Sequence, residues 1–207
     1  MKTAIRSERR QARPAPAARR RFIREFLGEP KVIGALAPSS PWLAARMVEG
    51  LDWEGARGVV EYGPGTGAVT EHILANLRPG ARFVAIERNL EMSRLSAERF
   101  PAARIVNDNA ANVRAICQRE GIDRVDLVLS GLPWPSFSSR LRTEILRATV
   151  DVLRPGGTFV TFGYHVGLLM RGAWHFRRLV EELFSEVTTS DVVWRNVPPA
   201  FIYRCRK

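Results

Sequence analysis

Residues 59–74 read VVEYGPGTGAVTEHIL, in which an apolar β-branched run meets a glycine-rich turn and then a helical pattern. Gly63, Gly65 and Gly67 allow the backbone to turn sharply and to approach a ligand closely, as in nucleotide-binding turns. The next β-branched run ends in Glu87, 24 residues beyond Gly63, where a carboxylate can bind ribose hydroxyls. The stretch therefore predicts an α/β fold with a nucleotide-binding edge. The alternative is a tight turn followed by an ordinary surface glutamate.

The chain after about residue 57 alternates short β-branched runs with helical patterns, which predicts crossover units and a mostly parallel sheet. Strands are expected at 58–63, 82–87, 104–107, 125–131 and 157–164. Helices are expected at 67–77, 89–99, 109–119, 137–153 and 173–184. Two further strand-like segments, 186–195 and 199–206, would add an antiparallel pair. The sequence thus predicts seven strands with helices on both faces of the sheet.

One predicted helix end rests on the sequence RPGG, residues 154–157. Pro155 cannot continue a helix, and Gly156 or Gly157 suits its C-terminal cap. We therefore expect the fourth of these helices to end just before this turn.

The charge of the chain is concentrated at its N-terminus. The net charge is +11, and residues 1–31 hold 10 Lys or Arg and 3 acidic residues, so that 10 − 3 = +7 lies there. Such an excess attracts an anionic partner, either nucleic acid or an acidic lipid surface. With 207 residues and an apolar share of 45%, the rest of the chain can bury one sizeable core. We expect a basic arm over residues 1–30 and one catalytic domain over residues 31–207.

A helix is predicted within this arm, bounded by Pro16 before it and by Gly28 and Pro30 after it, over about residues 17–27. Its apolar face comprises Phe22, Ile23, Phe26 and Leu27. The arginines that flank this face are Arg19, Arg20, Arg21 and Arg24. Such a helix can lie in a membrane interface, with its arginines on lipid phosphates. A helix packed on the domain and a nucleic-acid arm are the alternatives.

Cysteine usage and hydropathy bear on the compartment. Cys117 and Cys205 are far apart, and no apolar stretch follows the charged N-terminus as a signal peptide requires. The most apolar segment, residues 157–170, is shorter than the ~20 residues of a membrane-crossing helix. We expect a cytoplasmic protein in a reducing environment.

The glycine turn reads Gly-Pro-Gly-Thr-Gly and differs from the dinucleotide-binding pattern G-x-G-x-x-G. The sequence NDNA, residues 107–110, follows the third predicted strand, where Asp108 can accept the amino hydrogens of an adenine. This set resembles class I S-adenosylmethionine-dependent methyltransferases, which have a Rossmann-like fold. The resemblance implies S-adenosylmethionine as cofactor and S-adenosylhomocysteine as product. The cofactor-binding residues that it implies are Glu61, Gly63, Gly65, Thr66, Gly67, Glu87, Arg88, Asp108, Asn109, Ala110 and Ser130.

Residues 128–137, VLSGLPWPSF, come at the end of the fourth predicted strand, where open α/β sheets hold their substrates. In the family's amino-group methyltransferases this place usually carries Asn-Leu-Pro-Tyr or Asn-Pro-Pro-Tyr, whereas this chain has a tetrad that begins with Gly131 and ends with Trp134. Glycine lacks the side-chain oxygen that orients the amino group of a planar base. A backbone carbonyl, assigned to Leu132, and the indole face remain, and an indole attracts an alkylammonium by ~0.5–2 kcal/mol. The tetrad therefore favours an aliphatic amine, unless Trp134 simply packs the strand–helix corner.

Residues 22–47, FIREFLGEPKVIGALAPSSPWLAARM, closely resemble the start of bacterial phospholipid N-methyltransferases, and the resemblance continues through EYGPGTG and SGLPW over roughly residues 20–207. It implies methylation of phosphatidylethanolamine and its mono- and dimethyl products towards phosphatidylcholine. It also implies peripheral association with the anionic inner face of the cell membrane and no nucleic-acid partner. Ribosomal RNA adenine dimethylases share much of the pattern, so RNA adenine N6-methylation is the alternative. A non-enzymatic membrane- or nucleic-acid-binding protein on the same fold is the second alternative.

The remaining site residues concern the proton and the lipid headgroup. Tyr164 or His165, at the end of the fifth predicted strand, could accept or relay the proton of the ammonium, although a lone histidine is more often structural. We assign substrate binding to Ser39, Ser40, Gly131, Pro133, Arg177 and Arg195, although exposed arginines often only solvate a surface. His72 and His175 have no cysteine or carboxylate partner at ligand spacing, so no metal site is expected.

Overall fold

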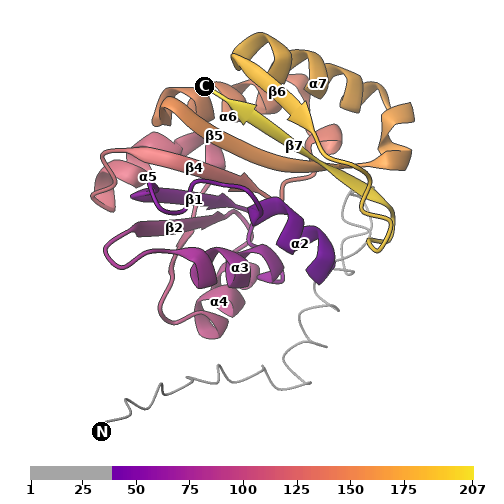
Figure 1. Cartoon of the computed structure of the whole chain (residues 1–207). Coiled ribbons are helices and arrows are strands. Elements are labelled where there is room, and N and C mark those ends of the chain that lie inside the picture. The colour runs from indigo at the N-terminus through magenta and orange to yellow at the C-terminus, as the bar shows by residue number, and fades with distance from the viewer. Residues whose placement is uncertain (1–38) are drawn as a thin grey trace, which may run out of the picture.

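A computed structural model describes residues 39–207 of the chain. The predicted basic arm of residues 1–30 and its helix of residues 17–27, with the membrane-binding residues assigned to it, lie outside the described residues. The described part folds around a single seven-stranded sheet in the order β3-β2-β1-β4-β5-β7-β6 (Figure 1). The predicted Rossmann-like sheet is confirmed.

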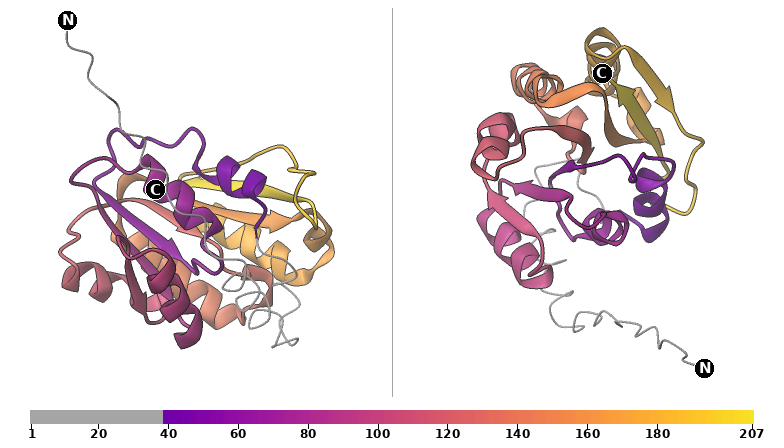
Figure 2. Two further views of the ribbon diagram at one scale, coloured as in Figure 1. Left: turned by 90° about the horizontal axis from the view of Figure 1, so that it is seen from below. Right: turned by 60° about the vertical axis from the view of Figure 1, so that its left-hand side comes forward.

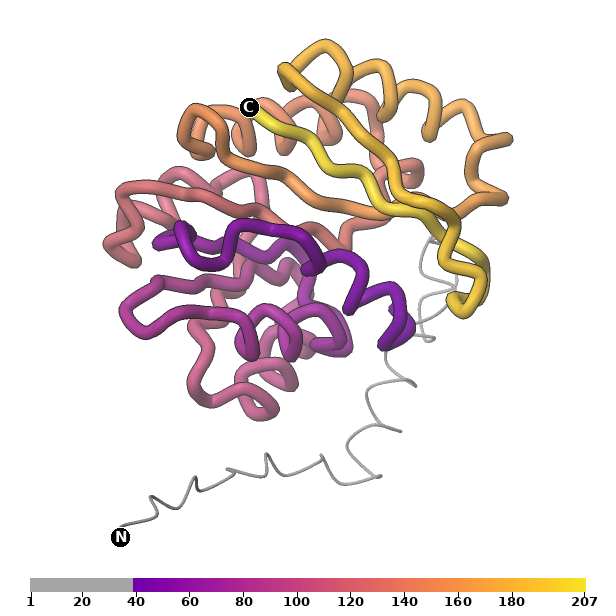
Figure 3. The backbone as a smooth tube through the Cα atoms, viewed as in Figure 1, coloured from indigo at the N-terminus to yellow at the C-terminus, as the bar shows by residue number. Residues whose placement is uncertain are grey.

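Five strands of the sheet run parallel: β1 (Gly58–Tyr62), β2 (Arg82–Glu87), β3 (Arg104–Asn107), β4 (Val125–Ser130) and β5 (Leu153–Tyr164). At the far side β7 (Ala200–Arg206) pairs antiparallel with β5 and with β6 (Glu186–Thr189), as the tube in Figure 3 shows. In this register Tyr62 faces both Ile86 and Ser130, and Glu87 faces Asn107. The carboxyl ends of β1, β2, β3 and β4 therefore meet at one edge.

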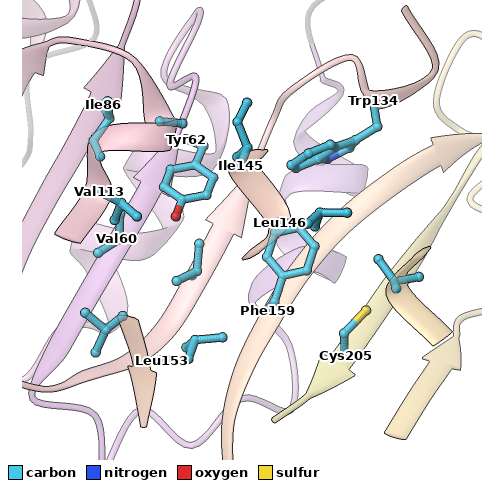
Figure 4. Packing of buried hydrophobic residues seen from close by; sticks show 14 of the residues in the cluster. Val60, Tyr62, Ile86, Val113, Trp134, Ile145, Leu146, Leu153, Phe159 and Cys205 are labelled. Carbon is cyan, nitrogen blue, oxygen red and sulfur yellow. The ribbon is translucent and has the colours of Figure 1, made fainter. Parts of the chain in front are cut away.

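Helices cover both faces of the sheet (Figures 1 and 2). One face carries α2 (Pro41–Val48) and α3 (Ala68–Asn76), with α4 (Leu90–Arg99) beside α3, and the other carries α5 (Val113–Arg119), α6 (Ser139–Val152) and α7 (Arg171–Leu183). Side chains of β1 alternate between the two cores, with Val59 in the first and Val60 and Tyr62 in the second. Figure 4 shows the second core, in which Leu146 and Phe159 pack near Trp134. Three 3-10 turns, η1 (Ala110–Asn112), η2 (Trp134–Ser136) and η3 (His165–Leu169), lie at strand ends.

The fourth predicted helix, over residues 137–153, forms as α6, two residues shorter at its start and one at its end, but its predicted glycine cap is wrong. The chain first forms η2, and α6 begins only after its N-cap Ser138, whose hydroxyl accepts a hydrogen bond from Leu141 N at 3.3 Å. At the other end Leu153 already pairs with Val125 of β4, so residues 154–157 belong to the irregular start of β5 and do not cap the helix. Gly156 has a φ of +74° there, and its N–H donates to the carbonyl of Lys207 at 2.8 Å.

Two other parts of the chain differ from what the sequence predicts. The strand predicted over 186–195 ends at Thr189, and beyond it Val193 makes only an isolated bridge with Ala200. Helix α2 was not predicted, although Ser40 followed by Pro41 is a typical helix start. The Ser40 hydroxyl caps α2 by accepting from Leu43 N at 3.2 Å. No helix within residues 39–207 has the length and apolarity needed to cross a bilayer.

Candidate active site

The glycine turn between β1 and α3 uses three left-handed residues, with φ of +65° at Gly63, +51° at Gly65 and +78° at Gly67. A side chain at Gly67 would collide with the ring of Phe100, and one at Gly63 would press on Leu132 at 3.0 Å. At Gly65 the nearest atom to a built Cβ is the Gly63 carbonyl oxygen at 3.8 Å. The first and third glycines thus serve packing, whereas the second presents bare backbone to open space, as a ligand cradle requires.

Helix α4 holds this turn from outside. The Ser96 hydroxyl donates to the carbonyl of Gly65 at 3.3 Å, and the Arg99 guanidinium donates to the carbonyl of Thr66. Arg99 also pairs with Glu71 at 3.0 Å, which links α4 to α3. Sequence reasoning missed both Ser96 and Arg99, because nothing in their local pattern distinguishes them from ordinary helix residues.

Glu61 lies at the end of β1 and is buried, with 1% of its surface exposed. The Thr70 hydroxyl donates to its carboxyl group at 2.7 Å. Burial raises the pKa of Glu61 to about 8; the Thr70 bond opposes this shift, and the nearby charge of Glu87 adds to it. Glu61 therefore holds a proton at neutral pH, and a cation bound beside it would favour its ionised form.

Glu87 and Asp108 follow β2 and β3. Burial raises the pKa of Glu87, while backbone N–H groups of Asn89, Gly65 and Arg88 oppose that shift, so its carboxylate lies against the glycine turn. Asp108 donates its backbone N–H to the carbonyl of Glu87 at 3.2 Å, which places the two strand ends together.

The Asp108 carboxylate already has partners within the protein. It accepts hydrogen bonds from Asn112 at 2.8 Å, from the N–H of Asn109 at 2.7 Å and from Arg119 at 3.2 Å. These bonds lower the pKa of Asp108, led by that from Asn112, and keep it ionised. The predicted adenine contact of Asp108 would therefore use the acceptor positions that remain on its carboxylate. The neighbouring Asn109 caps η1, because its side-chain oxygen accepts a hydrogen bond from Ala111 N at 3.1 Å.

The loop after β4 lies directly against the glycine turn. The N–H of Gly131 donates to Tyr62 O at 2.8 Å, and the Ser130 hydroxyl accepts from the N–H of Leu132 at 3.2 Å. Pro133, with φ of −80° and ψ of 70°, forms an inverse γ-turn in which the N–H of Trp134 donates to the carbonyl of Leu132 at 3.0 Å. The Leu132 carbonyl thus has one partner already, and only its second lone pair is left for an amine.

Trp134 corrects a prediction. Its indole, labelled in Figure 4, is 1% exposed. It stacks on Phe176 of α7 at 5.2 Å between ring centroids and donates from Nε1 to the hydroxyl of Thr161 at 3.0 Å. The expectation that its ring face holds an alkylammonium is wrong, because neither face is open to a substrate. The alternative, packing of the strand–helix corner, is the role that the structure gives it.

Arg142 of α6 holds the loop after β4 in place through hydrogen bonds to its backbone. The side chain is 4% exposed and donates to the carbonyls of Trp134 at 3.1 Å and of Phe137 at 2.8 Å. Desolvation lowers its pKa. No sequence signal identified Arg142, because its position in the helical pattern gives no hint of these two carbonyls.

A second group of predicted residues gathers beyond the end of β5. Tyr164 is half-buried, and burial raises its pKa, whereas His165 is exposed and donates its backbone N–H to Pro199 O at 2.8 Å. The N–H of Ser40, beside Ser39, donates to Asn196 at 2.9 Å, and the guanidinium of Arg195 lies 4.5 Å from the ring centre of Trp42.

Buried Asn196, which sequence reasoning missed, thereby joins the start of α2 to the loop before β7. Arg177 lies within α7 and pairs with exposed Glu181 at 2.8 Å. This position agrees with the alternative that Arg177 is an exposed surface arginine.

Comparison with known proteins shows the family of the chain. Residues 60–161 match the family model described as a methyltransferase domain. An ornithine lipid N-methyltransferase of Singulisphaera acidiphila is 37% identical over 188 residues, which cover 89% of this chain and 94% of that protein. The chain belongs to the lipid N-methyltransferase family. The predicted cofactor, S-adenosylmethionine, agrees with the methyltransferase domain of the family model.

Solved structures show the same fold. The O-methyltransferase TomG of Streptomyces achromogenes, in complex with S-adenosylmethionine, has a TM-score of 0.64 at 20% identity and covers 94% of this chain and 92% of its own. An O-methyltransferase of Bacillus cereus, in complex with S-adenosylhomocysteine, has a TM-score of 0.62 at 14% identity and the same two coverages.

The residues of this methyltransferase fit its cofactor. The open cradle at Gly65 would admit the cofactor to the backbone, Glu87 would bind ribose hydroxyls, and Asp108 would face the adenine amino group. Within residues 39–207 no three His, Cys, Asp or Glu side chains cluster as metal ligands would, and both cysteines are buried and free.

Proposed function

We propose that this methyltransferase transfers methyl groups from S-adenosylmethionine to the aliphatic amine of a membrane aminolipid. The observation that carries the proposal is the identity of 37% with an ornithine lipid N-methyltransferase across nearly the whole of both chains. The loop after β4 supports it, because Gly131 offers no side-chain oxygen to orient the amino group of a planar base.

Two lipids present such an amine. The sequence resemblance favours phosphatidylethanolamine and its mono- and dimethyl products, towards phosphatidylcholine. The Singulisphaera relative favours ornithine lipid as the second candidate. Both headgroups carry a flexible primary alkylammonium group beside an anionic group, so the same loop suits either amine.

S-adenosylmethionine supplies an electrophilic methyl group, so the chain's own task is to present a neutral amine in line with it and to exclude water. The second lone pair of the Leu132 carbonyl can accept an N–H of that amine and orient it. Burial keeps Tyr164 a neutral phenol, which suits it to relay a proton rather than to take one as a phenolate. His165, exposed at the next position, is then the proton acceptor.

We also propose that the protein associates peripherally with the inner face of the cell membrane through the arm of residues 1–30. The charge of +7 in residues 1–31 supports this, together with the apolar face that includes Phe22 and Phe26. Changing both phenylalanines to Asp should reduce co-sedimentation with anionic vesicles while leaving cofactor affinity intact. Unchanged vesicle binding would place the interface elsewhere.

Transfer of tritium from labelled S-adenosylmethionine tests the proposed reaction. Detergent-dispersed phosphatidylethanolamine, ornithine lipid and RNA should be offered separately, with Gly65→Val protein as the negative control. Label in either lipid, with mass analysis of the products, would support the proposal and identify the headgroup. Label in RNA with inert lipids would overturn it in favour of the adenine N6-methyltransferase alternative, and label in none would favour a non-enzymatic binding protein.

A further inference from the structure

Large apolar side chains are exposed together on one side of the folded domain. We call this set the apolar rim, and it comprises Trp42, Val166, Leu168, Leu169, Met170, Trp174, Trp194 and Val197. Leu169 is 92% exposed and Val197 77%, and large apolar side chains gathered in one exposed patch mark an interaction surface. Only Leu90, among the large exposed apolar residues of the described chain, lies outside the rim.

Hydrogen bonds and ring contacts join the separate segments of the rim into one surface. Trp174 of α7 donates from Nε1 to the carbonyl of Leu168 in η3 at 2.9 Å. His165, at the start of η3, lies 6.0 Å from Trp194 between ring centroids. Trp194 is followed in the loop between β6 and β7 by Arg195, which stacks on Trp42 of α2 at 4.5 Å. Three parts of the chain that are distant in sequence, namely the start of α2, residues 165–174 and the loop before β7, therefore form one continuous face.

The rim borders the active site. Turn η3 directly follows Tyr164, the last residue of β5, and Tyr164 pairs with Ala200 at the start of β7. The rim therefore lies at the carboxyl edge of the parallel strands, where the cofactor and substrate loops also lie. In Figures 1 and 3 the loop between β6 and β7 reaches past the sheet on the side where α2 begins.

The charges around the rim are basic. Residues 152–180 contain no Asp or Glu, and exposed Arg171 and Arg178 lie in that stretch. Arg195 adds a cation to the loop before β7, against the single acid Asp191. Tryptophan, aliphatic and arginine side chains in one face match the layered chemistry of a membrane interface, with rings at headgroup depth and cations on lipid phosphates.

We infer that the apolar rim inserts into the headgroup region of an anionic bilayer and holds the mouth of the active site against it. A lipid amine then reaches the loop after β4 without its acyl chains leaving the membrane. This surface belongs to the folded domain and is additional to the predicted helix of residues 17–27. The inference rests on the proposed function only in requiring that the substrate be a membrane lipid.

A fluorophore at Leu169 tests the insertion directly. Because Cys117 and Cys205 are both buried, a Leu169→Cys variant of the full chain can be labelled selectively with an NBD group. Vesicles of equal parts phosphatidylglycerol and phosphatidylcholine should shift its emission to the blue and increase its intensity. An Ala102→Cys variant, labelled at the exposed turn before β3 on the opposite edge of the sheet, should show no change.

Two results of this experiment would overturn the inference. The first is unchanged emission at position 169 while the protein co-sediments with the vesicles. The second is emission that is already blue-shifted without vesicles, because a second copy or another part of the chain would then cover Leu169.

A charge substitution tests the consequence for binding and catalysis. A Val166→Asp and Leu169→Asp double variant should partition roughly tenfold less onto the same vesicles than the parent protein. Ala102→Asp, the charge-matched control, should partition like the parent. Methylation of lipid in vesicles should fall with partitioning, whereas methylation of detergent-dispersed lipid should persist.

Unchanged partitioning of the double variant would overturn the docking surface. Absence of methylation of any lipid, with a normal NBD response, would instead overturn the proposed function and leave the docking surface standing.

Discussion

A Cβ atom on Gly131 would lie 2.8 Å from the carbonyl oxygen of Gly63. The loop after β4 and the turn after β1 are therefore packed backbone to backbone, with the N–H of Gly131 donating to Tyr62 O at 2.8 Å. Glycine at position 131 thus has a steric reason in this structure, in addition to the chemical consequence that it leaves no side-chain oxygen for a planar base.

Replacing Gly131 tests this close approach. Gly131→Ala should lower the free energy of unfolding by about 1–3 kcal/mol, because the methyl group must displace the Gly63 carbonyl. Gly131→Asn, which restores the residue usual in the family's amino-group methyltransferases, should lose more and should not gain activity on RNA. Urea unfolding measures both. Gly167→Ala is the control, since its Cβ meets only an ordinary contact of 3.8 Å.

Gly65→Val should abolish cofactor binding. The valine would occupy the open space at the cradle, and a β-branched residue at φ of +51° would also be strained. Gly65→Ala should show a weaker form of the same defect, with a stability cost of about 1–2 kcal/mol from the left-handed backbone. Calorimetric titration with S-adenosylmethionine and urea unfolding separate the two effects. A folded Gly65→Val protein that binds S-adenosylmethionine with the parent affinity would show that the turn does not take part in cofactor binding.

Glu87→Ala should weaken S-adenosylmethionine binding by ~1.5–3 kcal/mol, the usual loss for charge-assisted hydrogen bonds to hydroxyl groups. The same titration measures it. Glu98→Ala, which removes an exposed carboxylate of α4, is the control for the change of net charge and should leave the affinity unchanged. Equal affinities in the two variants would remove Glu87 from the site.

Glu61 should make the stability of the fold depend on pH. Its pKa is about 8 in the folded chain against 4.5 when unperturbed, so between these values the native state holds a proton that the unfolded chain has released. The stabilisation is fully present below 4.5 and is lost as pH rises through about 8. Urea unfolding from about pH 5 to about pH 9 should show this decline, and Glu61→Gln, a neutral acceptor for Thr70, should flatten it. If the free energy of unfolding of Glu61→Gln declines by the same amount over this pH range, groups other than Glu61 cause the decline.

The turn after β1 was predictable because its information is local. Gly63, Gly65 and Gly67 stand between a buried run and a helical pattern, and the geometry of parallel strands places Glu87 and Asp108 at the same edge. Residue order along the chain was enough to predict which strand ends meet.

The loop after β4 was only partly predictable, because its environment comes from distant segments. Trp134 is enclosed by Phe176, which lies 42 residues further along the chain, since 176 − 134 = 42. Its carbonyl is fixed by Arg142, whose burial no local pattern reveals. The apolar rim has the same origin, since the contact of Trp42 with Arg195 spans most of the described chain.

His165 and Tyr164 should separate by their pH–rate profiles. If His165 accepts the proton of the lipid ammonium, His165→Gln should lower kcat by about 10²–10⁴-fold, the usual contribution of a positioned base. The deficit should shrink as pH rises towards the ~10 at which free alkylammonium groups deprotonate, because solvent then supplies the neutral amine. Tyr164→Phe, which removes only a relay hydroxyl, should lose less activity at neutral pH. Detergent-dispersed lipid is the substrate for this comparison, so that membrane docking does not enter, and titration with S-adenosylmethionine should give the parent affinity for both variants. A His165→Gln deficit that stays constant across the whole pH range would show that His165 shapes the site and does not accept the proton.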